Sequence, residues 1–129
     1  MKHILAWDVA LQHGWDCAEA SMTHQSKSFK QVLVVGMGGS GIAGSLFSLI
    51  HRRMGGVSIT VLDTPEIPDS LAPDTLCIVC SYSGNTWETV SAYTQLVRQG
   101  QSIIVISSGG TLSVAAQHDG IPLITLPSG

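Results

Sequence analysis

Charged side chains are scarce in this sequence, and basic ones are the scarcest. Only 12% of the 129 residues are Asp, Glu, Lys or Arg, the formal net charge is −3, and no Lys or Arg stands between Arg53 and Arg98. A nucleic-acid partner held by a basic field is therefore not expected. An anion bound in that middle region must be held by backbone N–H groups, hydroxyls and helix N-termini rather than by ion pairs.

Cysteines and long apolar runs are also few. Cys17, Cys77 and Cys80 form an odd set without a disulfide framework, which favours a reducing, cytoplasmic compartment. Cys77 and Cys80 read as C-x-x-C, but LCIVCS predicts a buried strand whose positions three apart point to opposite faces, so redox or metal chemistry by this pair is not expected. No basic leader with an apolar run opens the chain, and no run approaches the ~20 apolar residues that span a bilayer. We expect a soluble protein with no membrane partner, no metal and no cofactor.

Apolar residues make up 44% of the sequence, enough for one domain over 1–129 to bury a core. Apolar spacings of three and four predict a leading amphipathic helix within 1–26, with Trp7 and Trp15 as packing anchors. Beyond it, Val/Ile runs alternate with helical segments, as is typical of a parallel sheet covered on both faces. We expect a five-stranded, flavodoxin-like α/β sandwich with 32–36 central. The strands are expected at 32–36, 57–63, 76–81, 101–108 and 122–126, and the helices at 40–54, 86–100 and 109–120.

The first glycine-rich loop is VVGMGGSGIAG, from Val34 to Gly44. Gly36, Gly38 and Gly41 satisfy G-x-G-x-x-G between a predicted strand and a predicted helix, which is the dinucleotide fingerprint in that setting. Asp63 falls at the end of the second predicted strand, where a ribose-binding acid would stand. A dinucleotide-binding domain is therefore one interpretation, and on the other Asp63 is an ordinary turn residue.

A second unusual loop, SYSGNTWET, follows the third predicted strand from Ser81 to Thr89. The hydroxyls of Ser81, Ser83 and Thr86 surround Gly84, which allows a steep turn into a helix whose first N–H groups are unpaired. An anion at this point would receive hydroxyl and backbone hydrogen bonds and the positive end of the helix dipole. Both loops are predicted to follow neighbouring parallel strands, at the edge where open α/β sheets bind ligands.

GMGGSGIAG followed by SYSGNTWET closely resembles the SIS (sugar isomerase) domain, and within it the amino-terminal half of bifunctional phosphoglucose/phosphomannose isomerases. The resemblance extends over nearly the whole chain. It implies an SIS-type fold in which Ser81, Ser83, Thr86 and Gly84 bind the phosphate of a phosphosugar, and Gly39 and Ser40 lie against the sugar. The interconversion of glucose 6-phosphate or mannose 6-phosphate with fructose 6-phosphate is the reaction that it implies.

The same resemblance indicates what this chain alone lacks. It implies that the catalytic Glu and His come from a second SIS domain, and that an Arg follows the P-x-G after the fifth strand, where this sequence ends at Gly129. Ser45 and Trp87 also depart from the residues usual at their positions. Glu88 and His118 are the only carboxylate and imidazole predicted near the strand ends, and we expect a helix-dipole role for Glu88 and a helix-end role for His118.

We therefore expect phosphosugar binding without isomerisation by this chain alone. A non-catalytic phosphosugar-sensing module is the alternative, with the dinucleotide-binding domain after it. A lone SIS domain leaves its site open at one side, and the apolar leading helix offers a surface for association. We expect a homodimer or pairing with a second SIS domain.

Overall fold

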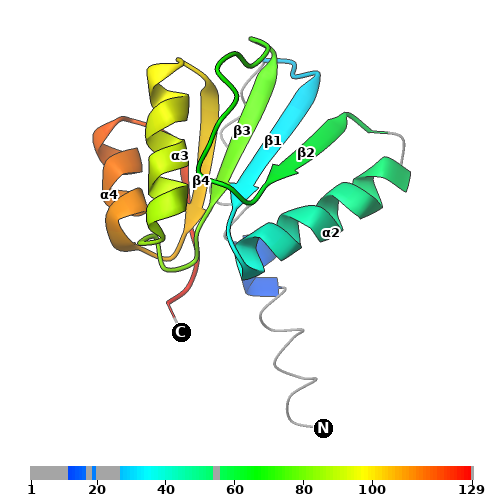
Figure 1. Cartoon of the computed structure of the whole chain (residues 1–129). Coiled ribbons are helices and arrows are strands. Elements are labelled where there is room, and N and C mark those ends of the chain that lie inside the picture. Colours follow the sequence, from blue (N-terminus) through cyan, green and yellow to red (C-terminus); the bar gives the residue numbers. More distant parts are fainter. Residues whose placement is uncertain (1–11, 17–18, 20–26, 54–55, 129) are drawn as a thin grey trace, which may run out of the picture.

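The computed structural model of the chain, which describes residues 12–16, 19, 27–53 and 56–128, contains one sheet of five parallel strands (Figure 1). Their spatial order is β2-β1-β3-β4-β5. Val34 of β1, for example, pairs with Val61 on one side and Ile78 on the other. The expected five-stranded parallel sheet is confirmed. The strands are β1 (Gln31–Gly36), β2 (Ser58–Leu62), β3 (Thr75–Cys80), β4 (Ser102–Ser107) and β5 (Leu123–Thr125).

The middle strand is β3 rather than β1, and the expectation that 32–36 would be central was wrong. Only β2 lies on the outer side of β1, whereas β3, β4 and β5 follow one another to its other side. The apolar run of β1 made it resemble the middle strand, but β3 and β4 carry runs of the same kind. In a parallel sheet, every interior strand is covered on both faces and is apolar throughout.

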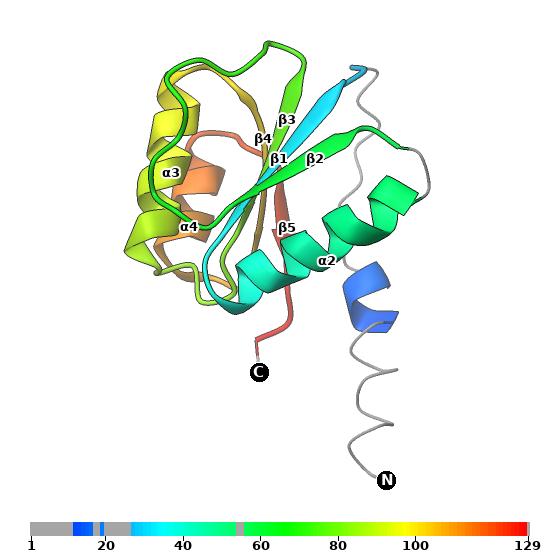
Figure 2. The same cartoon turned by 45° about the vertical axis from the view of Figure 1, so that its right-hand side comes forward.

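Three helices connect the strands: α2 (Gly39–Arg53), α3 (Trp87–Arg98) and α4 (Gly110–His118). The step from β1 to β2 runs in the opposite direction to the steps from β3 to β4 and from β4 to β5. Because such crossovers are right-handed, α2 must lie on one face of the sheet and α3 and α4 on the other. The two views show this arrangement, with α3 beside α4 and α2 apart from them (Figures 1 and 2).

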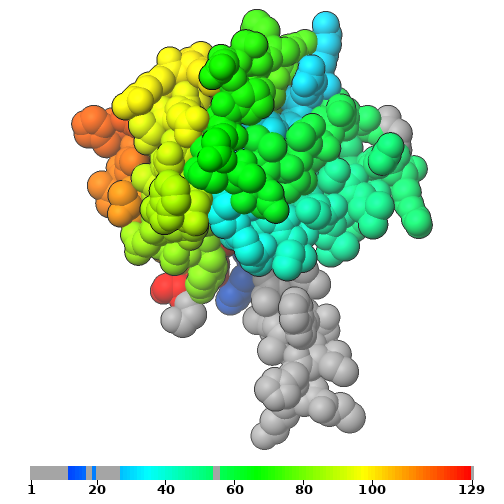
Figure 3. Space-filling model, in the orientation of Figure 1, coloured from blue at the N-terminus to red at the C-terminus, as the bar shows by residue number. Residues whose placement is uncertain are grey.

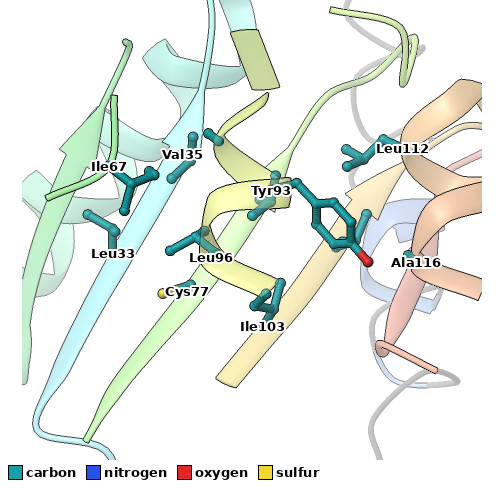
Figure 4. Close-up of a cluster of buried hydrophobic side chains, with 12 residues drawn as sticks. Leu33, Val35, Ile67, Cys77, Tyr93, Leu96, Ile103, Leu112 and Ala116 are labelled. Carbon is teal, nitrogen blue, oxygen red and sulfur yellow. The ribbon is translucent and has the colours of Figure 1, made fainter. Parts of the chain in front are cut away.

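The main core lies between the sheet and the α3/α4 pair. Leu33 and Cys77 project toward this side from neighbouring strands, with Leu96 of α3 beside them, and the Tyr93 ring of α3 points toward Ala116 of α4 (Figure 4). Leu96 is fully buried and Tyr93 is 2% exposed. Burying side chains of this size stabilises a fold by about 1.5 to 3 kcal/mol each, which fixes α3 against the strands.

The proline-punctuated connection between β2 and β3 crosses the same side of the sheet. Its Ile67 is buried in the main core, and the amide of Gln95 both donates to the carbonyl of Pro65 (2.7 Å) and accepts from the N–H of Ile67 (3.3 Å). Gln99 donates to the carbonyl of Pro68 (2.9 Å). Figure 3 shows this connection, in green, lying against α3, in yellow. Side-chain amides of α3 and of its C-cap residue thus pair with backbone groups of a connection that forms no regular structure.

Helix α2 packs on the sheet through small residues and leaves large ones outside. Gly41 and Gly44 are its buried positions, and a Cβ at Gly44 would come within 2.8 Å of Val34 Cγ1. Its outer side carries four apolar residues at helical spacing that are between 54% and 71% exposed. We call them the α2 stripe: Ile42, Leu46, Leu49 and Ile50.

The expected leading helix falls mostly outside the described residues, and so do Trp7 and Cys17. Residues 12–16 and 19 are helical. Trp15 is 68% exposed, so it is not a core residue of this chain. Among the described residues, no helix combines the length and apolarity needed to cross a bilayer.

Candidate functional site

Three loops meet at the carboxyl-terminal edge of the sheet, where β1, β3 and β4 lead into α2, α3 and α4. The positions of both sequence motifs follow from this topology, because β1 and β3 are adjacent and parallel. Open α/β sheets bind their ligands at this edge.

The loop between β1 and α2 is a tight glycine turn. Gly38 has φ +54°, in the left-handed region that favours glycine, and a Cβ at Gly36 would lie 3.1 Å from Ser40. The turn ends at once in α2, whose N–H at Ile42 already bonds the carbonyl of Gly38 (3.0 Å). It brings Gly39 and Ser40 to the sheet edge.

The loop between β3 and α3 interlocks with the loop between β4 and α4. Gly84 has φ +68°, and a Cβ there would overlap the carbonyl oxygen of Gly109. The Gly84 carbonyl accepts from the N–H of Leu112 (2.9 Å), and the Tyr82 carbonyl accepts from the N–H of Ser108 (3.0 Å). The loop between β3 and α3, which we call the hydroxyl loop, is therefore held in place by backbone hydrogen bonds to the loop between β4 and α4.

The N-termini of α3 and α4, which both lie at this edge, differ in whether a side chain caps them. The Oδ1 of Asn85 accepts hydrogen bonds from the N–H (3.0 Å) and the hydroxyl (3.1 Å) of Thr111, so it caps α4 from the neighbouring loop. Thr86, the N-cap residue of α3, makes no side-chain capping hydrogen bond. The positive end of α3 thus remains open to an anion.

The hydroxyls of the β3–α3 loop form an ordered chain of donors. The N–H of Gly84 donates to Ser81 Oγ (3.2 Å), and the Ser81 hydroxyl donates to Thr86 Oγ1 (3.4 Å). Ser81 itself is buried, with 3% of its surface exposed. The N–H of Asn85 donates to Ser83 Oγ (3.3 Å). Since Ser83 and Thr86 accept these bonds, their own hydroxyl protons remain available to donate to a ligand.

A hollow of about 1040 Å³ lies beside these hydroxyls, on the α2 side of the sheet. Its floor is apolar, and none of the described residues that line it carries a carboxylate, an imidazole or a cationic group. Burial raises the pKa of the Cys80 thiol in its wall to about 11. The described lining residues are Val34, Met37, Gly39, Ser40, Ala43, Gly44, Phe47, Ile78, Cys80, Ser81, Tyr82, Ser83, Thr86, Thr89, Ile106 and Leu126.

Most of the site residues expected from the sequence come together at this hollow. Gly39 and Ser40 lie on one side of it, and Ser81, Ser83 and Thr86 on the other. Gly84 is buried and shapes the turn behind them. The functional roles assigned to these residues remain predictions.

The residues weighed as alternatives lie elsewhere. Asp63 is exposed just beyond β2 and does not line the hollow. Glu88 stands in the first turn of α3 but is likewise absent from the lining. His118 ends α4, and because that helix runs away from the carboxyl-terminal edge, the sequence expectation that His118 lies near the strand ends was wrong. Trp87 is 66% exposed beside Thr86.

Among the lining residues that sequence reasoning missed, two carry hydroxyl groups, Tyr82 and Thr89. The Tyr82 hydroxyl donates to the carbonyl of Pro127 (3.1 Å), which ties the segment after β5 to the hydroxyl loop. No sequence signal could reveal that contact between distant segments. Thr89 could have been found, because it stands three residues after Thr86, on the same side of a helix.

The C-x-x-C cysteines lie on opposite sides of β3. Cys77 is fully buried in the main core, whereas Cys80 lines the hollow. Both thiols are free. Among the described residues, no group of three or more His, Cys, Asp or Glu is placed to hold a metal ion.

Comparison with curated proteins connects this geometry to phosphosugar enzymes. The chain is 38% identical to a bifunctional phosphoglucose/phosphomannose isomerase from Thermoplasma acidophilum over 128 residues, covering 99% of this chain and 39% of that protein. It is 37% identical to a protein of the same name from Caldicellulosiruptor bescii over 109 residues, covering 84% and 32%. A D-glucosamine-6-phosphate 4-epimerase from Sulfolobus acidocaldarius is 34% identical over 104 residues, covering 80% and 32%. The chain thus spans about a third of the length of these relatives.

Solved structures share the fold at lower identity. Tagatose-6-phosphate ketose/aldose isomerase from Escherichia coli matches with a TM-score of 0.62 at 20% identity, covering 98% of this chain and 36% of that one. The Vibrio vulnificus NanR protein complexed with ManNAc-6P matches with a TM-score of 0.65 at 14% identity, covering 95% and 51%. The family model of the SIS domain matches residues 27–125, a range that includes both glycine-rich loops and all five strands. The chain belongs to the SIS domain family.

Proposed function

We propose that the chain binds a phosphosugar, with the phosphate at Ser81, Ser83, Thr86 and Gly84 and the sugar against Gly39 and Ser40. We further propose that it forms part of an aldose–ketose isomerase that interconverts glucose 6-phosphate or mannose 6-phosphate with fructose 6-phosphate. The identity to phosphoglucose/phosphomannose isomerases supports this choice of reaction.

The observation that carries the binding proposal is an uncapped helix N-terminus surrounded by hydroxyl donors. Thr86 does not cap α3, and Ser83 accepts from the Asn85 N–H, which leaves its hydroxyl proton available to donate. Hydrogen bonds to a charged group are stronger than those between neutral groups, and a helix N-terminus adds favourable dipole energy. A phosphate can therefore bind here without any Lys or Arg.

The isomerisation chemistry requires groups from outside the hollow. Moving a proton between C1 and C2 needs a general base, and opening the sugar ring needs an acid/base group. The described residues that line the hollow offer hydroxyls, one thiol and apolar groups only. In this proposal the chain holds the phosphate and orients the sugar, and a second domain supplies the carboxylate and the imidazole.

The site is tested by two substitutions that separate the phosphosugar from the dinucleotide interpretation. Ser83→Ala should weaken binding of inorganic phosphate and fructose 6-phosphate by about 1 to 2 kcal/mol, roughly 5- to 30-fold, because one hydrogen bond to a charged partner is lost. Asp63→Ala should leave both affinities unchanged. Calorimetry that found NADH binding, abolished by Asp63→Ala and insensitive to Ser83→Ala, would replace this proposal with the dinucleotide one.

We also propose that the α2 stripe is the surface through which a second SIS-type domain pairs with this one. The stripe lies on α2, a helix that also contributes residues to the lining of the hollow, and the relatives are long enough for a further domain. In the chain alone, the same surface should drive homodimerisation.

Leu46→Glu should then abolish association in analytical ultracentrifugation, because burying an unpaired charge in the middle of the stripe has a large free-energy cost. Val114→Glu is the matched control, since Val114 is 67% exposed on α4, on the opposite face. A strictly monomeric parent chain at high concentration would contradict the pairing.

A non-catalytic sensing role is the second candidate. The described lining residues include no carboxylate and no imidazole, which favours this role because a sensor needs only to bind. Activity that is absent both from this chain and from its mixture with a second SIS-type domain would support it.

A cytoplasmic location completes the proposal. The free thiols Cys77 and Cys80 fit a reducing compartment, in which cysteines do not pair. Cell fractionation with an antibody against the chain would test this.

A further inference from the structure

Thr89 stands one turn after Thr86 on α3 and has an unusual environment. Its side chain is fully buried, yet the residue lines the hollow. Its Oγ1 is buried and has no hydrogen-bond partner. A buried hydroxyl without a partner costs about 1 to 3 kcal/mol. Folding alone therefore gives no reason for a hydroxyl at this position.

Thr94, in the same helix, shows how a helical threonine ordinarily satisfies its hydroxyl. Its Oγ1 donates to the carbonyl of Val90, four residues earlier, at 2.9 Å. The corresponding acceptor for Thr89 is the carbonyl of Asn85, and Thr89 makes no bond to it. The hydroxyls of Thr75 and Ser113 are also buried without a partner, but among these three residues only Thr89 lines the hollow.

The position of Thr89 relates it to the anion site. Thr86 is the N-cap residue and Thr89 is the third residue of the helix, so their side chains are neighbours on one side of the first turn. Threonine in a helix occupies two χ1 rotamers, whereas valine is nearly confined to one. A χ1 rotation exchanges the methyl and the hydroxyl while the backbone stays in place.

We infer that Thr89 is a further ligand of the anion site. When a phosphate lies at the start of α3, the Thr89 side chain rotates and its hydroxyl donates to a phosphate oxygen. This inference rests on the proposed phosphosugar site. It adds a fourth hydroxyl to those of Ser81, Ser83 and Thr86, and it accounts for a buried polar group that the fold itself does not use.

Thr89→Val is the decisive variant, because it exchanges the hydroxyl for a methyl group at nearly constant volume. Its affinity for inorganic phosphate and fructose 6-phosphate, measured by calorimetry, should fall about tenfold. Its thermal midpoint without phosphate should be unchanged or higher, since a partnerless buried hydroxyl is removed. Thr89→Ser should keep the affinity. Thr94→Val is the matched control on the same helix and should bind as the parent chain does.

The outcomes separate this inference from the site proposal. If Thr89→Val binds both probes as tightly as the parent while Ser83→Ala binds them more weakly, Thr89 is not a ligand and the site stands. If the parent chain binds neither probe, or if Ser83→Ala leaves both affinities unchanged, the site proposal fails. This inference then fails too, because it depends on that site. A lower thermal midpoint for Thr89→Val without phosphate would also overturn the inference, because the fold would then be using the hydroxyl.

Discussion

The phenol of Tyr93 donates a hydrogen bond to Oδ2 of Asp119 at 2.8 Å, which links the middle of α3 to the end of α4. Asp119 also bonds His118 through its other oxygen (2.9 Å). The bonds to His118 and then to Tyr93 hold the pKa of Asp119 below its usual value. Burial first and the Asp119 bond second raise the pKa of Tyr93 well above the usual tyrosine value, so its phenol remains a donor.

Tyr93→Phe should lower the urea midpoint of unfolding at pH 7 and have less effect in acid. A depressed carboxyl pKa stabilises the fold above the unfolded pKa of about 4, and this stabilisation is lost as the pH falls through the folded pKa. The difference between variant and parent should therefore narrow below about pH 4. Tyr82→Phe is the control, because its hydrogen bond goes to a backbone carbonyl that does not titrate. A pH-independent deficit in Tyr93→Phe would contradict this account.

Asn85→Ala should destabilise the chain by about 1 kcal/mol, the usual cost of losing a helix cap. The lost contacts are the two hydrogen bonds from Thr111 to Asn85 Oδ1. Asn85→Asp keeps an acceptor oxygen at the start of α4 and should retain stability, but its negative charge should weaken phosphate binding at the adjacent α3 terminus. Chemical denaturation and phosphate calorimetry on both variants measure the two effects. Equal stability of Asn85→Ala and the parent would refute the cap.

Gly84→Ala should be far more damaging than Gly100→Ala, although the two glycines have nearly the same φ, +68° and +67°. Alanine in this region costs about 1 to 2 kcal/mol in either place. A Cβ at Gly100 meets no heavy atom within 4 Å, whereas a Cβ at Gly84 overlaps the Gly109 carbonyl. Gly84→Ala should therefore also lose phosphate binding, and Gly100→Ala should keep it. Similar thermal midpoints for the two variants would mean that the interlocked loops separate easily.

The purified chain should bind phosphosugars without interconverting them. Each positioned acid or base contributes typically 10²- to 10⁴-fold, and the described lining of the hollow supplies neither a carboxylate nor an imidazole. A coupled isomerase assay should therefore show a rate near background for the parent, for Glu88→Gln and for His118→Ala. Robust turnover that vanished in Glu88→Gln would make the chain an isomerase in its own right.

The fold could be predicted from the sequence because its signals are local. The Val/Ile runs of β1, β3 and β4 and the glycines at the helix ends mark each element within a residue or two. The position of β3 in the middle of the sheet could not be predicted in this way, since it depends on the direction in which each crossover moves.

The candidate site likewise has one part that the sequence predicts and another part that depends on contacts between distant residues. Ser81, Ser83 and Thr86 could be grouped from one short motif, because residues at a strand end and a helix start are close by chain geometry. The cap that Asn85 provides to α4 and the bond from Tyr82 to Pro127 join residues 26 and 45 positions apart. A short sequence motif carries no information about contacts between residues so far apart in the chain.

The alkylation rates of the two thiols of β3 report two different local opening motions, one of the main core and one of the hollow side of the sheet. Cys77 can meet an alkylating reagent only when the main core separates, whereas Cys80 needs only the hollow side to open. Burial raises the pKa of both thiols to about 11, so each reacts slowly while covered. With Cys17 replaced by serine, mass spectrometry of alkylated peptides would time each opening separately. Phosphosugar binding should slow the alkylation of Cys80 more than that of Cys77. The difference would show how much more the ligand stabilises the hollow side of the sheet than the main-core side.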